Sequence, residues 1–546
     1  MLIGENGDDD IHVEQCETFQ ENFLKSGYYD MNFDKLYLAA YDEQVVRDKF
    51  VEYLNRGERF GVYVGHGTPI SLTKTQIITN LDKAIETKYQ HLPIIYFSTC
   101  DIARFDNGCS NIVSQMLTNT QGGLVACVAS TRVVYTNLNG LSSDSFARSL
   151  AKHPDYYGGK KTLGKVFIDA KRYAGEKTVN HMKYHIIGDP ALPLELPINR
   201  AVITKANDVS LSNAKTTVSA PVGSTVTLNG EIRNSQGETM TDFDGFGIVQ
   251  LYDARKYYMT AKKAIADNTR PATDLYTRGA LLTETRVDIN AGKFNCDITI
   301  PEFAEAGNDS IMPVRIIAVD RDDRIFSGVC QQIVMNRSEA AAIEPDTDAP
   351  EITALYINNK ETFVDGMEVE PDIMFCAEIS DNGSINVSSE SFVSSMTVQL
   401  DGGKTTCPVI GYTPIDNNSG LIQMPFYDLS EGRHVAELIV PDISGNVSRK
   451  SISFTVNASL SERQITLDRP ASFDEVTIDL NNADGVQTTL VVKNSLNTEI
   501  LRSDVAFPYR WDLRDSEGNK LPAGDYDIYA IVDGRGSNIR KFVILK

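Results

Sequence analysis

The chain has 546 residues, with a formal net charge of −22 at pH 7, 42% hydrophobic residues and 23% charged residues. This length predicts three or four domains, and this composition is typical of folded globular proteins. The sequence holds no cluster of lysine and arginine, so we expect no nucleic-acid partner. The acidity favours solubility, and it is either a plain solvated surface or a weak electrostatic guide for basic substrates.

The cysteines are too sparse for a dense disulfide framework. Two pairs, Cys296 with Cys330 and Cys376 with Cys407, each fall within one β-rich region, which fits one disulfide per domain or four free buried thiols. No run of roughly 18 apolar residues occurs, so no transmembrane helix is predicted. The first ten residues lack the pattern of a signal peptide and are typical of a strand that enters a turn.

The elements expected over residues 1–197 alternate between strands and helices. This alternation predicts an α/β domain with a mostly parallel sheet. Apolar runs predict strands at 35–40, 60–64, 93–98 and 123–129. Helical patterns occur at 11–26, 43–56, 109–119, 139–152 and 162–175.

From residue 198 onward the pattern is β-rich, and we divide it into three domains. Residues 198–343 predict a β-sandwich interrupted by one helix at 255–266. After a linker at 344–350, residues 344–456 predict an immunoglobulin-like domain without the Cys…Trp…Cys pattern of antibodies. Residues 457–546 predict a C-terminal β domain with a hairpin loop between Trp511 and Tyr526. The strands expected in the first of these domains are 202–205, 216–220, 224–232, 247–251, 292–300 and 313–319.

Two strands of the N-terminal domain end in residues suited to nucleophilic catalysis. The run 60–64 precedes a Gly-His-Gly triplet centred on His66, and the run 93–98 ends near Cys100. Ligands of α/β sheets bind beyond the carboxyl ends of the strands, so adjacent parallel strands place both side chains at one edge. A cysteine attacks as its thiolate, and a histidine takes and returns the proton. We predict a His66–Cys100 catalytic pair, with the Gly67 and Cys100 N–H groups as oxyanion donors.

Other cysteines and histidines give weaker signals. Cys109 is expected to open a helix, and Cys127 lies in an apolar run, which favours core packing. His181 and His185 have the spacing of a metal pair, but no third ligand is evident, so no metal site is predicted there.

Several motifs in residues 1–197 resemble those of one peptidase family. They are Tyr63-Val64-Gly65-His66-Gly67, Phe97-Ser98-Thr99-Cys100-Asp101, Arg104-Phe105-Asp106, Gly122-Gly123-Leu124-Val125-Ala126, Ala129-Ser130-Thr131-Arg132-Val133-Val134-Tyr135 and Leu163-Gly164 with Ile187-Gly188-Asp189-Pro190-Ala191-Leu192. As a set, these motifs resemble the gingipain-type cysteine peptidases, and within that family the sortases of the type IX secretion system of Bacteroidota. The rest of the chain resembles the domains that follow the peptidase in this family.

The resemblance implies an α/β caspase-like (gingipain-type) peptidase domain, partial at its N-terminus, followed by all-β, immunoglobulin-like sandwich domains. It gives His66 the role of general base and acid and Cys100 that of nucleophile. Earlier strands, and an acid that supports the histidine, are expected upstream of Met1. A Gly-x-x-Asp-Ile spacing points to Asp10 as the acid that reads a basic substrate side chain, with a helix N-cap or first-turn acid as the alternative.

For function, the resemblance implies a cysteine endopeptidase of the type IX secretion system at the cell surface. Such a sortase cleaves C-terminal sorting domains from secreted cargo and transfers the cargo to water or to a surface glycolipid. Its expected partners are that cargo and other secretion components at the outer membrane, and no cofactor is predicted. The alternatives are a secreted gingipain-like protease of extracellular protein, and a non-catalytic surface protein with a truncated peptidase core. Residues 457–546 resemble a type IX sorting domain, or form an ordinary final sandwich.

Overall fold

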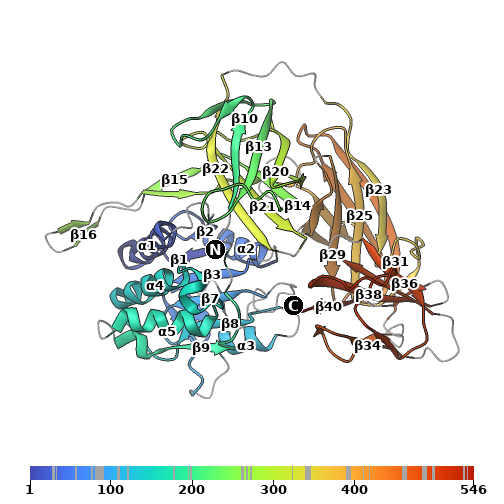
Figure 1. Ribbon diagram of the computed structural model, residues 1–546, viewed down its shortest axis with the longest axis horizontal. Coiled ribbons are helices and arrows are strands. Elements are labelled where there is room, and N and C mark those ends of the chain that lie inside the picture. Colours follow the sequence, from blue (N-terminus) through green and yellow to red (C-terminus); the bar gives the residue numbers. More distant parts are fainter. Residues whose placement is uncertain are drawn as a thin grey trace.

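The computed structural model describes most of the chain, and it places an α/β unit beside three β-rich units (Figure 1). The residues not described are 27–30, 32, 56–57, 75–77, 80–91, 107–110, 120–121, 176–178, 195, 197–199, 260–262, 266–267, 271–273, 322–323, 339–345, 389–394, 410, 417, 458–463, 482–487, 495–497, 533–534, 538 and 546. Within the described part, no helix has the length and apolar character needed to cross a membrane.

The N-terminal unit is built on one six-stranded sheet. Its order is β2-β1-β3-β7-β8-β9, and all neighbours are parallel except β8 and β9. The strands are β1 (Leu2–Gly4), β2 (Lys35–Tyr37), β3 (Phe60–Val64), β7 (Ile94–Ser98), β8 (Ala126–Ser130) and β9 (Tyr184–Gly188). After β3 comes a small antiparallel sheet of β4 (Gly67–Thr68), β5 (Ser71–Leu72) and β6 (Ile78–Thr79). The predicted, mostly parallel sheet is confirmed.

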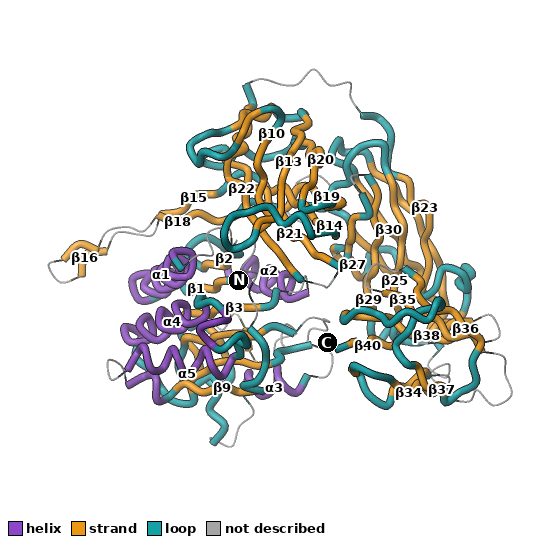
Figure 2. Tube along the Cα trace, viewed as in Figure 1, coloured by secondary structure: helices purple, strands orange, loops and turns teal. Residues whose placement is uncertain are grey.

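Helices cover both faces of this sheet (Figure 2). They are α1 (Ile11–Lys25), α2 (Glu43–Asn55), α3 (Ile112–Thr118), α4 (Thr136–Leu150) and α5 (Leu163–Ala174). Successive strand residues point to opposite faces. Ile95 and Phe97 pack in the core with α2 and α3, whereas Ile94 and Tyr96 pack with α1, α4 and α5. Burial on both faces explains why the first four residues of β7 are all apolar. All five predicted helices are confirmed.

The second unit follows one hydrogen-bonded path of strands, β19-β14-β21-β22-β10-β13-β20, with β11 on β10 and β12 on β22. Its strands are β10 (Arg200–Ala206), β11 (Val209–Ser210), β12 (Val218–Pro221), β13 (Thr225–Arg233), β14 (Gly245–Tyr252), β19 (Leu281–Ile289), β20 (Lys293–Thr299), β21 (Ile311–Asp320) and β22 (Ile325–Asn336). Alternate residues of β13, such as Val226 and Leu228, enter the core. The strands predicted for this unit are confirmed.

The predicted helix at 255–266 is wrong, because this segment forms strands. β15 (Lys256–Met259) pairs with β18 (Asp274–Thr277), and β16 (Lys263–Ile265) pairs with β17 (Asn268–Arg270). Tyr257 lies opposite Tyr276 in the first pair, with ring centroids 5.4 Å apart. Cross-strand aromatic pairing of this kind stabilises a two-stranded ribbon.

The base of this ribbon docks on the peptidase-like unit. Leu275 is fully buried in the same core as α1 and α4. Nearby, Arg278 forms a buried ion pair with Asp34, whose side chain is 8% exposed. Burial alone would raise the pKa of Asp34, but the Arg278 guanidinium holds it well below its ordinary value. The first two units are therefore joined by apolar packing and by a desolvated charge pair.

The third unit is a sandwich of two sheets, β23-β25-β29-β28 and β24-β31-β30-β26-β27. Its strands are β23 (Glu351–Ile357), β24 (Glu368–Val369), β25 (Ile373–Ser380), β26 (Thr397–Leu400), β27 (Thr405–Pro408), β28 (Tyr412–Pro414), β29 (Ser419–Phe426), β30 (Gly432–Pro441) and β31 (Val447–Val456). Both sheets contribute to a single core, to which Phe375 comes from one sheet and Phe454 from the other.

The fourth unit also has two main sheets, β32-β34-β37 and β33-β40-β38-β35-β36, with β39 on β38. Its strands are β32 (Ile465–Leu467), β33 (Ala471–Ser472), β34 (Val476–Leu480), β35 (Thr488–Asn494), β36 (Glu499–Asp504), β37 (Tyr509–Trp511), β38 (Gly524–Val532), β39 (Arg535–Gly536) and β40 (Arg540–Ile544). The predicted hairpin after Trp511 is wrong, because β37 and β38 lie in different sheets. Only a local turn closes there, through a bridge between Arg514 and Lys520.

The hydrophobic cores follow the same order along the chain. Two clusters flank the α/β sheet, and one cluster fills each β-rich unit. On this basis we propose the four-domain division at 1–197, 198–343, 344–456 and 457–546. All the cysteines in the described part of the chain are free thiols, including the two pairs considered above, and Cys109 lies outside that part.

Candidate active site

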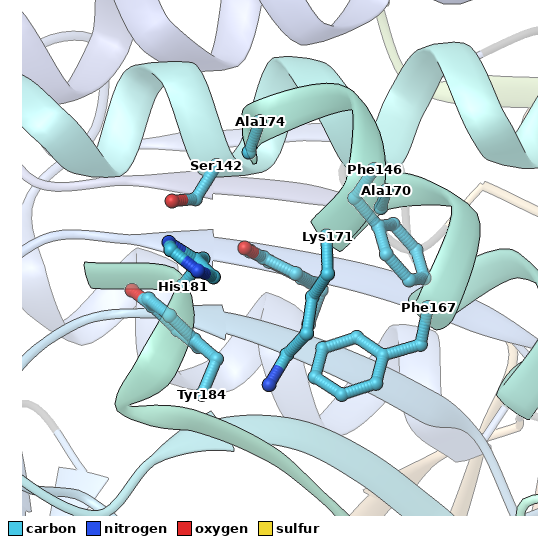
Figure 3. Close-up of a pocket in the computed structure, with 9 residues that line it drawn as sticks. Ser142, Phe146, Phe167, Ala170, Lys171, Ala174, His181 and Tyr184 are labelled. Atoms are coloured by element: carbon cyan, nitrogen blue, oxygen red, sulfur yellow. The ribbon is translucent and has the colours of Figure 1, made fainter. Parts of the chain in front are cut away.

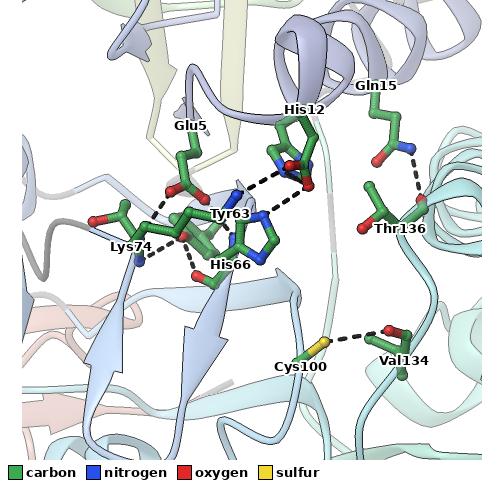
Figure 4. Close-up of polar contacts among 11 residues, drawn as sticks. Glu5, His12, Gln15, Tyr63, His66, Lys74, Cys100, Val134 and Thr136 are labelled. Carbon is green, nitrogen blue, oxygen red and sulfur yellow. Dashed lines mark hydrogen bonds and ion pairs between the residues drawn. The ribbon is translucent and has the colours of Figure 1, made fainter.

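His66 and Cys100 lie at the same edge of the α/β sheet. β3 and β7 pair in parallel from Phe60 opposite Ile94 to Val64 opposite Ser98. Each candidate follows its strand by two residues, so the parallel register brings both to the carboxyl edge (Figure 4). The geometry expected from the sequence rests on this register.

The backbone of His66 is held on both sides. Its N–H donates to the Glu5 carboxylate, at 2.6 Å between N and Oε2. Its carbonyl accepts hydrogen bonds from the Tyr63 hydroxyl at 2.5 Å and from the Thr73 N–H at 2.9 Å. Glu5 is only 3% exposed, and its other oxygen accepts the Lys74 N–H at 2.8 Å. These hydrogen bonds fix the backbone of the loop that carries His66.

The ring of His66 contacts an acid that the sequence analysis missed. The Nε2 atom lies 2.7 Å from Oδ2 of Asp8, in a short turn at Asp8–Asp10 just before α1. Burial would raise the pKa of Asp8, but hydrogen bonds from Lys74 and His66 outweigh this effect and lower it. The expectation that the histidine's acid lies upstream of Met1 is therefore corrected, since a carboxylate partner is present in this chain. Its only signal in the sequence was the run of three aspartates after Gly7.

Two glycines flank His66 because side chains would not fit. A Cβ on Gly65 would lie 2.6 Å from the Tyr63 hydroxyl and 2.9 Å from the Glu5 Cβ. A Cβ on Gly67 would lie 2.5 Å from Oγ1 of Thr99 and 3.2 Å from the Cys100 carbonyl oxygen. The second contact brings the backbone after His66 against the backbone of the cysteine.

Cys100 is partly buried between two loops. Its Sγ donates a hydrogen bond to the Val134 carbonyl at 3.3 Å, in the loop that follows β8. Asp101, the next residue, adopts a left-handed conformation with φ 53°, and its N–H points to the Arg132 carbonyl at 3.3 Å. No partner occurs for the Cys100 N–H within the described residues. This amide is available for an oxyanion.

Asp10 occupies the helix N-cap position that the alternative predicted. It is 7% exposed and stands at the N-cap position of α1, in a left-handed conformation with φ 61°. Its side chain makes no capping hydrogen bond. The role of Asp10 in reading a basic side chain stays a prediction.

Two groups of side chains in the described part of the chain could hold a metal ion, and neither includes His181 or His185. They are Glu5 with His12 and His66, and Asp346 with Asp381 and Asp442. His181 instead lines a small, largely apolar pocket between α4, α5 and β9 (Figure 3). The pocket residues are Tyr96, Ser142, Phe146, Phe167, Ala170, Lys171, Ala174, His181 and Tyr184. None of them belongs to the His66–Cys100 site.

Comparison with known proteins identifies the N-terminal unit. The family model of peptidase family C25 matches residues 1–195. Among solved structures, dimeric latent PorU from Porphyromonas gingivalis shows 20% identity and a TM-score of 0.33, covering 78% of this chain and 41% of PorU. The Arg-specific cysteine proteinase gingipain R (RgpB), a protein of the same organism, shows 15% identity and a TM-score of 0.30, covering 61% of this chain and 66% of its own. No curated protein matches.

The identification rests on the family model alone, because TM-scores of 0.33 and 0.30 are too low to support it. This chain spans about two-fifths of the PorU chain, 41% of its length. The sequence motifs that indicated a gingipain-type peptidase lie within the matched range, so that prediction is confirmed. Residues 1–195 of this chain match the model of peptidase family C25, a family of cysteine peptidases.

Proposed function

We propose that the chain is a cysteine endopeptidase that acts as a sortase of the type IX secretion system. The single observation that carries the catalytic half is the placement of His66 and Cys100 at the ends of two paired parallel strands, within a C25 peptidase domain. The sortase half rests on the motif set described in the sequence analysis.

In the first step, His66 takes the proton of the Cys100 thiol and the sulfur attacks the scissile carbonyl carbon. The new C–S bond places negative charge on the carbonyl oxygen, where the N–H groups of Cys100 and Gly67 are the proposed donors. Collapse of this intermediate breaks the C–N bond. The proton held by His66 passes to the leaving amine, and a thioester remains on Cys100.

Asp8 sets the tautomer of His66 for this step. An ionised carboxylate only accepts hydrogen bonds, so its contact with Nε2 places a hydrogen on that atom. The lone pair of the neutral ring is then on Nδ1, which becomes the base for the thiol. The carboxylate also stabilises the imidazolium that forms after proton transfer. Asp8 is thus a positioning residue.

In the second step, water or the amine of a surface glycolipid attacks the thioester. His66 removes a proton from the attacking group, the C–S bond breaks, and the thiol of Cys100 is restored. The proposed substrates are secreted proteins with C-terminal sorting domains, and the proposed setting is the outer face of the outer membrane with other secretion components. Residues 457–546 are proposed as a sorting domain of the chain itself.

Purified full-length chain, incubated with a cargo protein and with a panel of unrelated peptides, tests this proposal. We expect cleavage at the boundary of the cargo's sorting domain, loss of cleavage in Cys100→Ala, and normal cleavage in Cys407→Ala, a matched partly buried thiol. Cleavage that persists in Cys100→Ala refutes the dyad. Efficient cleavage of unrelated peptides with intact cargo favours the secreted protease instead.

A further inference from the structure

His12 is a buried histidine that the proposed mechanism does not use. It lies in the first turn of α1 and is 2% exposed, and both its ring nitrogens are buried without a hydrogen-bond partner. Oδ2 of Asp8 lies 3.6 Å from Nε2, which is too far for a hydrogen bond. Buried polar groups are normally satisfied, so an imidazole left in this state calls for a ligand.

The ring of His12 faces the active-site histidine. The two ring centroids lie 5.3 Å apart, with the planes at 86°. Glu5, His12 and His66 each offer one ligand atom, and these atoms all lie within 4.8 Å of one another. The three residues come from separate elements, after β1, in α1 and after β3, and Figure 4 shows their side chains converging. The packed sheet and helix thus hold the cluster together.

We propose that Glu5, His12 and His66 form a binding site for Zn²⁺, and that an ion bound there inhibits the peptidase. Two imidazoles and one carboxylate are a ligand set that zinc prefers, whereas calcium and magnesium take oxygen ligands. Asp8 stands beside the three as a further oxygen donor, with Oδ2 2.7 Å from Nε2 of His66. Its other oxygen binds Lys74 at 3.0 Å. The ion would share the Asp8 carboxylate with that ammonium group.

Inhibition follows from the chemistry of the imidazole. A neutral ring has one nitrogen with a free lone pair, and the other carries the hydrogen. When the lone pair of His66 binds the metal, the remaining nitrogen is an N–H group that cannot accept the thiol proton of Cys100. Chelation frees the ring and restores the base, so the inhibition is reversible. The binding claim stands independently of the proposed function, and only the inhibition claim rests on it.

Cobalt(II) and zinc titrations of the chelator-treated full chain test the site. Because Co²⁺ reports its ligands by visible absorption, we expect a low-coordinate spectrum without a thiolate charge-transfer band, in the wild type and in Cys100→Ser alike. In His12→Gln the metal dissociation constant should rise by roughly 100-fold or more, since even an outer-shell partner costs 10–100-fold. His153→Gln, a half-exposed matched control, should bind as the wild type does.

Two results would overturn the proposal. One is a thiolate band that disappears in Cys100→Ser, because the metal would then sit on the cysteine. The other is unchanged affinity in His12→Gln. Near-ultraviolet circular dichroism shows whether His12→Gln folds. If it does not, the cobalt spectrum of Cys100→Ser and the metal affinity of Glu5→Gln test the site in its place. With active enzyme, His12→Gln should keep its basal rate and lose zinc inhibition. If the chain binds the metal but cleaves no substrate, the proposed function is refuted and the metal site is still supported.

Discussion

Replacing Asp8 with asparagine tests how the site prepares its base. The Asp8→Asn variant keeps the shape of the side chain but removes the charge that faces Nε2 of His66 at 2.7 Å. Hydrogen bonds to charged groups contribute about 1.5–3 kcal/mol. The Asp8 side chain is 38% exposed, so water screens part of this energy and we take about 1–2 kcal/mol. That energy corresponds to a fall in kcat of roughly 5- to 30-fold.

The assay is steady-state cleavage of a fluorogenic peptide derived from a cargo boundary. A positioning residue that acts only through His66 should lower kcat and leave KM nearly unchanged. Asp8→Glu should recover part of the rate. The matched control is Asp155→Asn, whose side chain is 86% exposed and distant in the fold, and which should behave as the wild type does. An unchanged kcat in Asp8→Asn would refute the role of this carboxylate.

Three further predictions concern close contact, buried charge and pH. Gly67→Ala should lower kcat by about 100-fold with little loss of stability. The reason is that the new Cβ would press on Thr99 and displace the active-site backbone. Peptide cleavage measures the first effect and thermal melting the second. Arg278→Ala should destabilise the chain by about 3–5 kcal/mol in urea unfolding, because it leaves the Asp34 carboxylate buried without its cation. Burial and two neighbouring carboxylates raise the pKa of Asp381 to about 6, above its ordinary 3.8, so the folded state holds this proton more tightly than the unfolded chain. The free energy of unfolding should therefore fall as the pH rises through 6. In EDTA, Asp381→Asn should have a higher melting temperature than the wild type at pH 8 and the same melting temperature at pH 4.

The predictions for Arg278 and Asp381 each have a control variant that should not show the effect. Arg321→Ala removes an arginine that is 83% exposed and should change the free energy of unfolding by less than about 0.5 kcal/mol. Glu351→Gln removes an exposed carboxylate from the same sandwich and should not alter the pH dependence of melting. Equal effects in a variant and its control would contradict the corresponding mechanism.

The N-terminal α/β unit could be predicted because its signals are local. Runs such as 94–97 are apolar throughout, since a parallel strand between two helix layers is buried on both faces. Their positions place His66 and Cys100 at one edge without knowledge of any contact. Asp8 and His66 are 58 positions apart in the sequence, and no sequence spacing predicts their contact.

The errors have the same physical origin. The segment at 255–266 carries residues that tolerate a helix, and its actual state depends on pairing with Asp274–Thr277. The loop after Trp511 has good turn residues, but the indole is buried in a core built by both sheets, which separates the two flanking strands. In both places tertiary contacts override a local preference.

Covalent labelling tests the central claim most directly. A cargo-derived peptide that ends in a chloromethyl ketone should alkylate the full chain, because the thiolate displaces chloride and leaves a stable thioether, and peptide mapping by mass spectrometry locates the modified residue. The account predicts a single modified cysteine, Cys100, with labelling that slows by at least about 100-fold in His66→Ala because the base is lost. Labelling of a different cysteine, or labelling of Cys100 at the same rate without His66, would contradict it.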